Sequence, residues 1–325
     1  MTESFDDLML NTGSGVAPVH IDGEQRRRIL DEAIRATPIA PRHPRRIRLV
    51  AVAAAVTLAV GGFAYQGFGA QANRAEAREV LTQAAIHAQD PPASPGQYWE
   101  ITMNSTTLNG VDDALYLVSV QDVDYVAVSG SRPDWYVRGE PQLLRQVSGA
   151  PHQPTFEGVL DIWTTNIAAD EMPGFWQAPS PSWLAELPRD PIALRERLDV
   201  DVVGHGSDPI DEVFVVVADV LRSGRVQADL RASLFEVLMD LPGTQVTDGD
   251  ATIDGRTGVA IGRPDILGSH TELIIDPDGG QVLGERTNQQ LGPVPFIGET
   301  VTLETSFSRT LVDEIPADIR AEADQ

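Results

Sequence analysis

The chain has 325 residues and a net charge of -24, and it contains neither cysteine nor lysine, so that all 24 basic residues are arginine. The absence of cysteine excludes disulfides, thiolate catalysis and cysteine-ligated zinc. Acidity without any lysine argues against nucleic acid as a partner, because phosphate binding requires clustered basic side chains.

Residues 1–48 are predicted to be cytoplasmic and disordered, apart from one short amphipathic helix. Asp22 and Gln25 have the spacing of a capping box, which places the start of the helix there. A helix of about 14 residues folds poorly alone, so its apolar stripe needs a surface to cover it. The stripe, expected to contact a cytoplasmic partner or the membrane, is formed by Ile29, Leu30, Ala33 and Ile34.

An uncharged run over residues 49–70 is predicted to form a single transmembrane helix, because about 20 apolar residues can cross a bilayer. It directly follows Arg42, Arg45, Arg46 and Arg48, and positive charge is retained on the cytoplasmic side of a span. The alternative is a signal peptide, with Ala70-Gln71-Ala72 as a cleavage site of the small-x-small form. Both interpretations place residues 73–325 outside the membrane, as one acidic extracytoplasmic domain.

The first part of that domain is predicted to contain a helix followed by strands. Residues 74–89 have helical apolar spacing, and Asp90 with the two prolines after it ends the helix. Residues 97–137 read as neighbouring strands of an antiparallel meander, with turns at Asn109-Gly110 and over residues 130–133. A long aromatic loop comes next, with a short helix expected near residues 159–169.

The second part is predicted to contain helices followed by strands. Asp190-Pro191 and Asp208-Pro209 each cap and begin a helix, and a third helix covers residues 227–241. The rest reads as about five strands with tight turns, at Asp254-Gly255 and over residues 276–280. Separate blocks of strands and helices favour an α+β fold with an antiparallel sheet over the alternating βαβ pattern of nucleotide-binding folds.

Several segments between residues 182 and 285 resemble a known family when taken in order: SWLAELPRDPIALRERL, VLRSG, LRASLFEVLMDLPGTQV, DGRTGVAI and ELIIDPDGGQVLGER. They are similar to the CU044-type family, uncharacterised single-pass membrane proteins of high-GC Gram-positive bacteria. The resemblance implies an outer domain like the LolA and RseB half-barrel, in which a curved antiparallel sheet wraps around helices. It also implies a topology like that of membrane-bound anti-sigma factors. The zinc-binding signature of one anti-sigma type requires cysteine and is excluded here, and no catalytic residues come with the family.

Catalytic and metal motifs are missing from the sequence. The six histidines are never three or four residues apart, so no helical metal site is encoded. Aspartates at 248, 250 and 254, and at 276 and 278, lie where hairpins need turns and lack the glutamate of a calcium loop. Neither a G-x-S-x-G elbow nor a phosphate-binding glycine loop occurs. We therefore expect no enzyme activity, no cofactor and no metal.

The aromatic segment is the candidate binding surface. Most tryptophans of such a domain belong to its core, but some can line an apolar groove. If the half-barrel resemblance holds, the residues near the mouth of the concave side are Trp163, Phe175, Trp176 and Trp183. The first functional interpretation is a membrane-anchored regulatory or sensory protein, with a ligand or protein bound outside and a partner such as a sigma factor bound inside. The alternative is a tethered extracytoplasmic carrier or scaffold for lipids or lipoproteins.

Overall fold

The computed structural model describes residues 71–111, 114–149, 161–165, 168–205, 208–263, 270–291 and 300–323. The predicted cytoplasmic region 1–48, with Ile29, Leu30, Ala33 and Ile34, and the predicted span 49–70 lie outside these residues. Among the helices that are described, none combines the length and apolarity needed to cross a membrane. The segments Asn73–Gln290 and Thr300–Gln325 form one compact unit.

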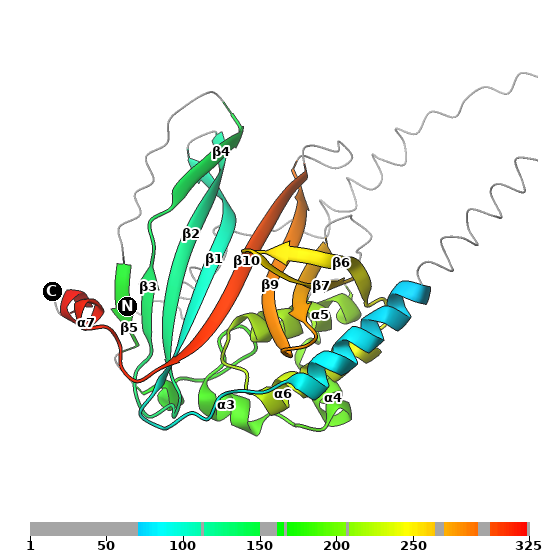
Figure 1. Cartoon of the computed structure of the whole chain (residues 1–325), viewed down its shortest axis with the longest axis horizontal. Helices are drawn as coiled ribbons and strands as arrows, with labels where there is room; N and C mark the ends of the chain where they lie inside the picture. The colour runs from blue at the N-terminus through cyan, green and yellow to red at the C-terminus, as the bar shows by residue number, and fades with distance from the viewer. Residues whose placement is uncertain are drawn as a thin grey trace, which may run out of the picture. The chain divides into compact units, whose positions relative to one another are not determined.

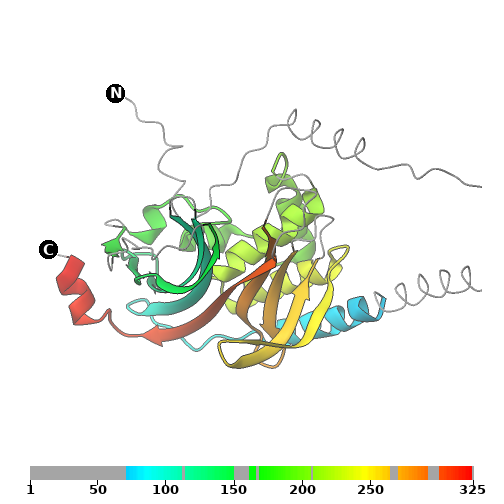
Figure 2. The same ribbon diagram turned by 90° about the horizontal axis from the view of Figure 1, so that it is seen from above.

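The described strands form an antiparallel sheet that is open rather than closed (Figures 1 and 2). Its order is β5-β3-β2-β1-β10-β9-β8-β7-β6, and β4 pairs with β2 beside this path. The bounds are β1 Tyr98–Val111, β2 Ala114–Ala127, β3 Trp135–Arg138, β4 Gln142–Ser148, β5 Asp161–Thr164, β6 Gln245–Ile253, β7 Arg256–Gly262, β8 His270–Asp276, β9 Gln281–Gln290 and β10 Thr300–Val312. The predicted α+β class with an antiparallel sheet is confirmed.

The connection between β1 and β2 lies further along the chain than predicted. Gly110 pairs with Leu115 and Val111 with Ala114, so β1 runs straight through the expected turn at Asn109-Gly110 and β2 begins after it. The prediction of a turn there is wrong. Long pairing between two strands of 14 residues each outweighs the local preference of an Asn-Gly pair.

The region after β3 also differs from the prediction. β5 occupies residues for which a short helix was expected, and only Ala169–Glu171 forms a turn of 3-10 helix. β4 was not predicted at all. β5 is a strand because it pairs with β3 along its whole length, from Trp135↔Thr164 to Arg138↔Asp161, a tertiary contact that local spacing does not encode.

The four helices predicted near residues 74–89, after Asp190, after Asp208 and over 227–241 are present, and two of them start at the Asp-Pro pairs. The Asp190 carboxylate accepts from the Ala193 amide at 2.9 Å, and that of Asp208 from the Ile210 amide at 2.8 Å. The described helices cover residues 71–87, α3 Pro181–Glu186, α4 Pro191–Asp201, α5 Pro209–Arg222, α6 Ala228–Asp240 and α7 Ala317–Ala323. Of these, α3 and α7 were not predicted.

The main core lies between one face of the sheet and the helices (Figure 2). The predicted face of the helix over 71–87 is buried there through Ala77, Leu81 and Ala84, as are the apolar stripes of α5 and α6. Strands β6, β7 and β8 contribute Val246, Ile261, Leu273 and Ile275. The opposite face near β1 and β2 packs against the C-terminal segment, where Ile315 and Ile319 contact Tyr98 and Tyr125.

Candidate functional site

A cavity of about 340 Å³ lies on the helix-facing side of the sheet, next to β1, β9 and β10. Its apolar wall consists of Trp99, Ile101, Leu221, Val226, Val282, Leu283 and Phe307. Its charged and amide groups come from Asp90, Arg231, Arg256, Asp276, Gln281 and Arg309. Apolar walls with a few converging polar groups are typical of small-molecule sites, although this volume is at the lower end of their range.

Strand alternation explains which side chains reach the cavity. Trp99 and Ile101 are two residues apart on β1, and Phe307 and Arg309 are two apart on β10, so each pair points to the same face. The register pairs Ile101 directly with Arg309. Cross-strand partners have Cβ atoms about 5 Å apart, which brings an apolar and a charged side chain together at the cavity wall.

The connection between α5 and α6 closes one side of the cavity. Gly224 in this connection has φ 65°, and a Cβ there would lie 2.8 Å from Cδ1 of Ile101. Both the left-handed backbone and the close approach therefore require glycine. The next residue but one, Val226, lines the cavity.

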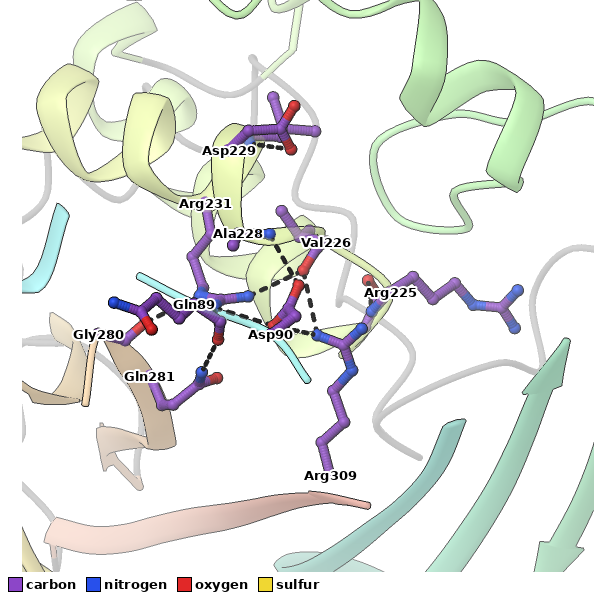
Figure 3. Close-up of polar contacts among 12 residues, drawn as sticks. Gln89, Asp90, Arg225, Val226, Ala228, Asp229, Arg231, Gly280, Gln281 and Arg309 are labelled. Atoms are coloured by element: carbon purple, nitrogen blue, oxygen red, sulfur yellow. Dashed lines mark hydrogen bonds and ion pairs between the residues drawn. The ribbon is translucent and has the colours of Figure 1, made fainter. Parts of the chain in front are cut away.

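Asp90 organises the charged end of the cavity (Figure 3). Its Oδ1 accepts from Arg231 Nη2 at 3.1 Å and from Arg309 Nη1 at 3.2 Å. Its Oδ2 accepts from the backbone amide of Ala228, the first residue of α6, at 2.8 Å. Gln227, at the N-cap position, makes no side-chain capping bond, so Asp90 supplies the cap from a distant part of the chain.

Arg309 is the residue at this end of the cavity with buried hydrogen-bond donors that have no acceptor. Its guanidinium lies 3.5 Å from the centroid of the Trp99 ring, and Nη1 also donates to the Val226 carbonyl at 3.4 Å. Nε and Nη2 are buried and have no hydrogen-bond partner. Burial lowers the pKa of Arg309 to about 10, with Asp90 opposing and Arg231 adding to the shift, so the group is charged at neutral pH. A buried donor left unpaired costs about 1–3 kcal/mol.

A second polar cluster lies on the same face of the sheet, in the same cross-strand row. The row runs Trp163, Tyr136, Asp124, Ile101, Arg309 from β5 to β10. Arg225, which points away from Asp90 in Figure 3, donates to Asp134 Oδ2 at 2.6 Å and to Tyr136 Oη at 3.0 Å. Burial raises the pKa of Asp124 to about 7, against the attraction of Arg225.

None of the four aromatic residues predicted to bind a ligand lines the cavity. Trp163 is 37 % exposed and stacks on Tyr136 at 5.2 Å between ring centroids. Trp176 is buried, donates from Nε1 to Asp201 at 2.9 Å and meets Trp183 edge-on at 4.9 Å, while Phe175 is exposed. Ligand binding by these four residues stays a prediction. Trp99, the tryptophan that does line the cavity, is spaced like its neighbours and carries no distinguishing sequence signal.

Of the aspartates considered for metal binding, Asp254, Asp276 and Asp278 lie at hairpin turns, whereas Asp248 and Asp250 lie within β6 and not in the turn that was expected there. Asp254 Oδ2 accepts from Asn104 Nδ2 at 3.1 Å and from Ser306 Oγ at 3.2 Å, which attaches the β6–β7 hairpin to β1 and β10. Asp248 and Asp276 each accept from the amide two residues on. No group of three metal-ligating side chains occurs within the described part of the chain.

Comparison with known proteins found no matching family model and no curated protein of similar sequence. Two solved structures are weakly similar. One, a DUF1329 family protein from Desulfovibrio piger, has 10 % identity and a TM-score of 0.21, with 74 % of this chain and 92 % of that chain covered. The other, a LolA superfamily protein from Nitrosomonas europaea, has 10 % identity and a TM-score of 0.18, with 75 % and 96 % covered. Likenesses this weak support no conclusion, so membership of the CU044-type family stays a prediction.

Proposed function

We propose that the domain over residues 73–325 is a non-catalytic carrier or binding domain for a small apolar ligand, held outside the cell by the span over residues 49–70. The observation that carries this proposal is the cavity beside β1, β9 and β10, with its wall of tryptophan, phenylalanine and branched aliphatic side chains. Binding of an apolar molecule against this wall is favourable by roughly 25 cal/mol per Å² of apolar surface removed from water.

The polar contacts at the cavity support binding rather than catalysis. Asp90 is the carboxylate best placed to act as a base, but hydrogen bonds occupy both of its oxygens, from Arg231, Arg309 and the Ala228 amide. The regulatory interpretation depends on residues 1–48, which lie outside the described residues, so the carrier interpretation has the firmer support.

The test is direct ligand binding by the full-length chain in lipid nanodiscs. The probe is 2-bromodecan-1-ol, since bromine quenches tryptophan emission at contact range and Trp99 lines the cavity. We expect saturable quenching in the unaltered protein. Val282→Phe adds a ring to the cavity wall and should weaken binding by roughly fivefold or more.

The control is Val215→Phe, which makes the same change at a side chain 41 % exposed on α5. It should bind the probe as the unaltered protein does. Quenching that never saturates would contradict the proposal. So would quenching of equal strength in all three proteins and in empty nanodiscs combined with free tryptophan.

A further inference from the structure

We infer that the ligand of this cavity carries an anionic head group, a carboxylate or a phosphate, which binds to the Nε and Nη2 edge of Arg309. The inference rests on the proposed function and specifies its ligand class: an amphiphile with an acidic head and a short apolar body. It starts from the two donors of Arg309 that are buried and have no partner.

The free edge of Arg309 has the geometry for a planar anion. Nε and one terminal nitrogen of a guanidinium point their hydrogens the same way and form a fork that matches the two oxygens of a carboxylate. The other terminal nitrogen, Nη1, is already used by Asp90 and the Val226 carbonyl. Stacking on Trp99 at 3.5 Å fixes the plane of the group, so the fork is oriented before a ligand arrives.

The charges along the cavity wall favour an anion. Three arginines and two aspartates line it, in a chain whose net charge is -24. Arg231 is fully engaged, with Gly280, Val226 and Gln89 carbonyls and Asp90 as acceptors. Asp276 Oδ1 accepts from the Asp278 amide within its own turn. Arg256 Nη2 donates to the carbonyls of Leu283 at 3.0 Å and Phe307 at 2.6 Å. Arg309 is thus the arginine of this wall that has buried donors without a partner.

Arg286, which lies in a second surface hollow, has no such unpaired donors. Arg286 lies in an open groove across β8, β9 and β10, where its guanidinium meets carboxylates of Glu304 at 3.1 Å, Glu272 at 3.5 Å and Asp248 at 3.6 Å. Three carboxylates around one guanidinium repel a further anion. The contrast between Arg286 and Arg309 is what assigns the anion to the cavity.

The experiment compares three probes of equal chain length on the full-length protein: 2-bromodecan-1-ol, 2-bromodecanoate and 2-bromodecyl phosphate. We expect at least one anionic probe to bind about tenfold or more tightly than the alcohol, because hydrogen bonds to a charged group are the strong ones. The stronger of the two anions identifies a carboxylate or a phosphate as the head group. Arg309→Met keeps the length of the side chain without its charge and should abolish the preference, whereas Arg309→Lys should keep part of it.

The matched control is Arg195→Met, which removes an arginine paired with Asp199 on α4, away from the cavity. It should leave the preference unchanged. Equal affinity for all three probes would contradict the anion inference but not the proposed function. If none of the three probes binds saturably, both the inference and the proposed function are contradicted. Should Arg309→Met fail to fold, the comparison of probes on the unaltered protein still decides the question.

Discussion

Asp124 is the residue whose ionisation the fold opposes most clearly. It lies on β2 beside Tyr136 in the cross-strand row of the helix-facing side. Burial raises the pKa of its carboxyl to about 7, and the neighbouring Asp122 and Asp134 add to this shift, while Arg225 and Arg138 oppose it. Arg225 compensates only partly, because its guanidinium is bound to Asp134 at 2.6 Å. The unpaired carboxylate therefore weakens the fold when it is charged.

Replacing Asp124 should stabilise the protein at high pH and not at low pH. The carboxyl of an unfolded chain has a pKa of about 4, so between about pH 4 and pH 7 the folded state keeps a proton that the unfolded state has lost, and stability falls as the pH rises. Asp124→Asn has no ionisable carboxyl at this position and therefore removes this fall in stability with rising pH. We expect a gain of about 3–4 kcal/mol in the free energy of unfolding at pH ~8 and little change at pH ~4, measured by urea titration.

Asp240→Asn is the control for this prediction. Its carboxylate pairs with Arg78 on the surface, where both side chains are more than half exposed, and exposed pairs contribute little. It should change stability by less than about 0.5 kcal/mol at either pH. A stability difference for Asp124→Asn that does not vary with pH would show that its ionisation has no such role.

At the scale of elements, the turn between β8 and β9 joins the sheet to the first described helix. Gly280 in this turn has φ 61°, and a Cβ there would lie 2.6 Å from the Ala84 carbonyl oxygen, near the end of the helix over 71–87. Its own carbonyl accepts from Arg231 Nε at 2.8 Å. The turn thus holds the helix, α6 and the charged end of the cavity together.

Gly280→Ala should therefore destabilise the protein through two effects, backbone strain and overlap with the helix. Gly255→Ala is the matched control, because Gly255 has φ 72° but open space where a Cβ would lie. We expect about 1 kcal/mol for strain alone at Gly255 and roughly 2–4 kcal/mol at Gly280. Hydrogen exchange should also show faster opening of residues 80–87 in Gly280→Ala only. Equal losses in both variants would mean that the helix yields to the added methyl group without cost.

Elements that depend on local spacing were predictable, and those that depend on pairing were not. The Asp-Pro pairs at 190 and 208 mark helix starts in both the sequence and the structure, because a cap needs only residues within one turn. β5 is a strand because β3 lies beside it, and β1 continues past Asn109-Gly110 because β2 pairs with it. Pairing partners are distant in sequence, so local pattern does not reveal them.

At the scale of the whole molecule, charge is divided unevenly along the chain. Residues 1–48 contain eight arginines and seven acidic residues, so nearly all of the net charge of -24 lies after the predicted span. Strong acidity keeps a domain soluble and separate from acidic membrane surfaces. The predicted topology, with the N-terminus inside and the acidic domain outside, agrees with this division.

The absence of cysteine allows this topology to be tested with single introduced thiols. Ala185→Cys lies at an exposed position on α3, and Ser14→Cys lies in the predicted cytoplasmic region. A membrane-impermeant maleimide added to intact cells should label the first variant and label the second only after permeabilisation. Labelling of Ala185→Cys that also requires permeabilisation would contradict the extracytoplasmic location.

The sequence by itself determined the class of the fold, most helices, and which faces of them are buried, because apolar periodicity and capping act within a few residues. The cavity was decided only by the tertiary structure. Asp90 and Arg309 are 219 residues apart, and their contact depends on the order of strands and on the helix cap that Asp90 provides to α6. Local pattern specifies that a residue is buried, whereas folding over long distances specifies what it is buried against.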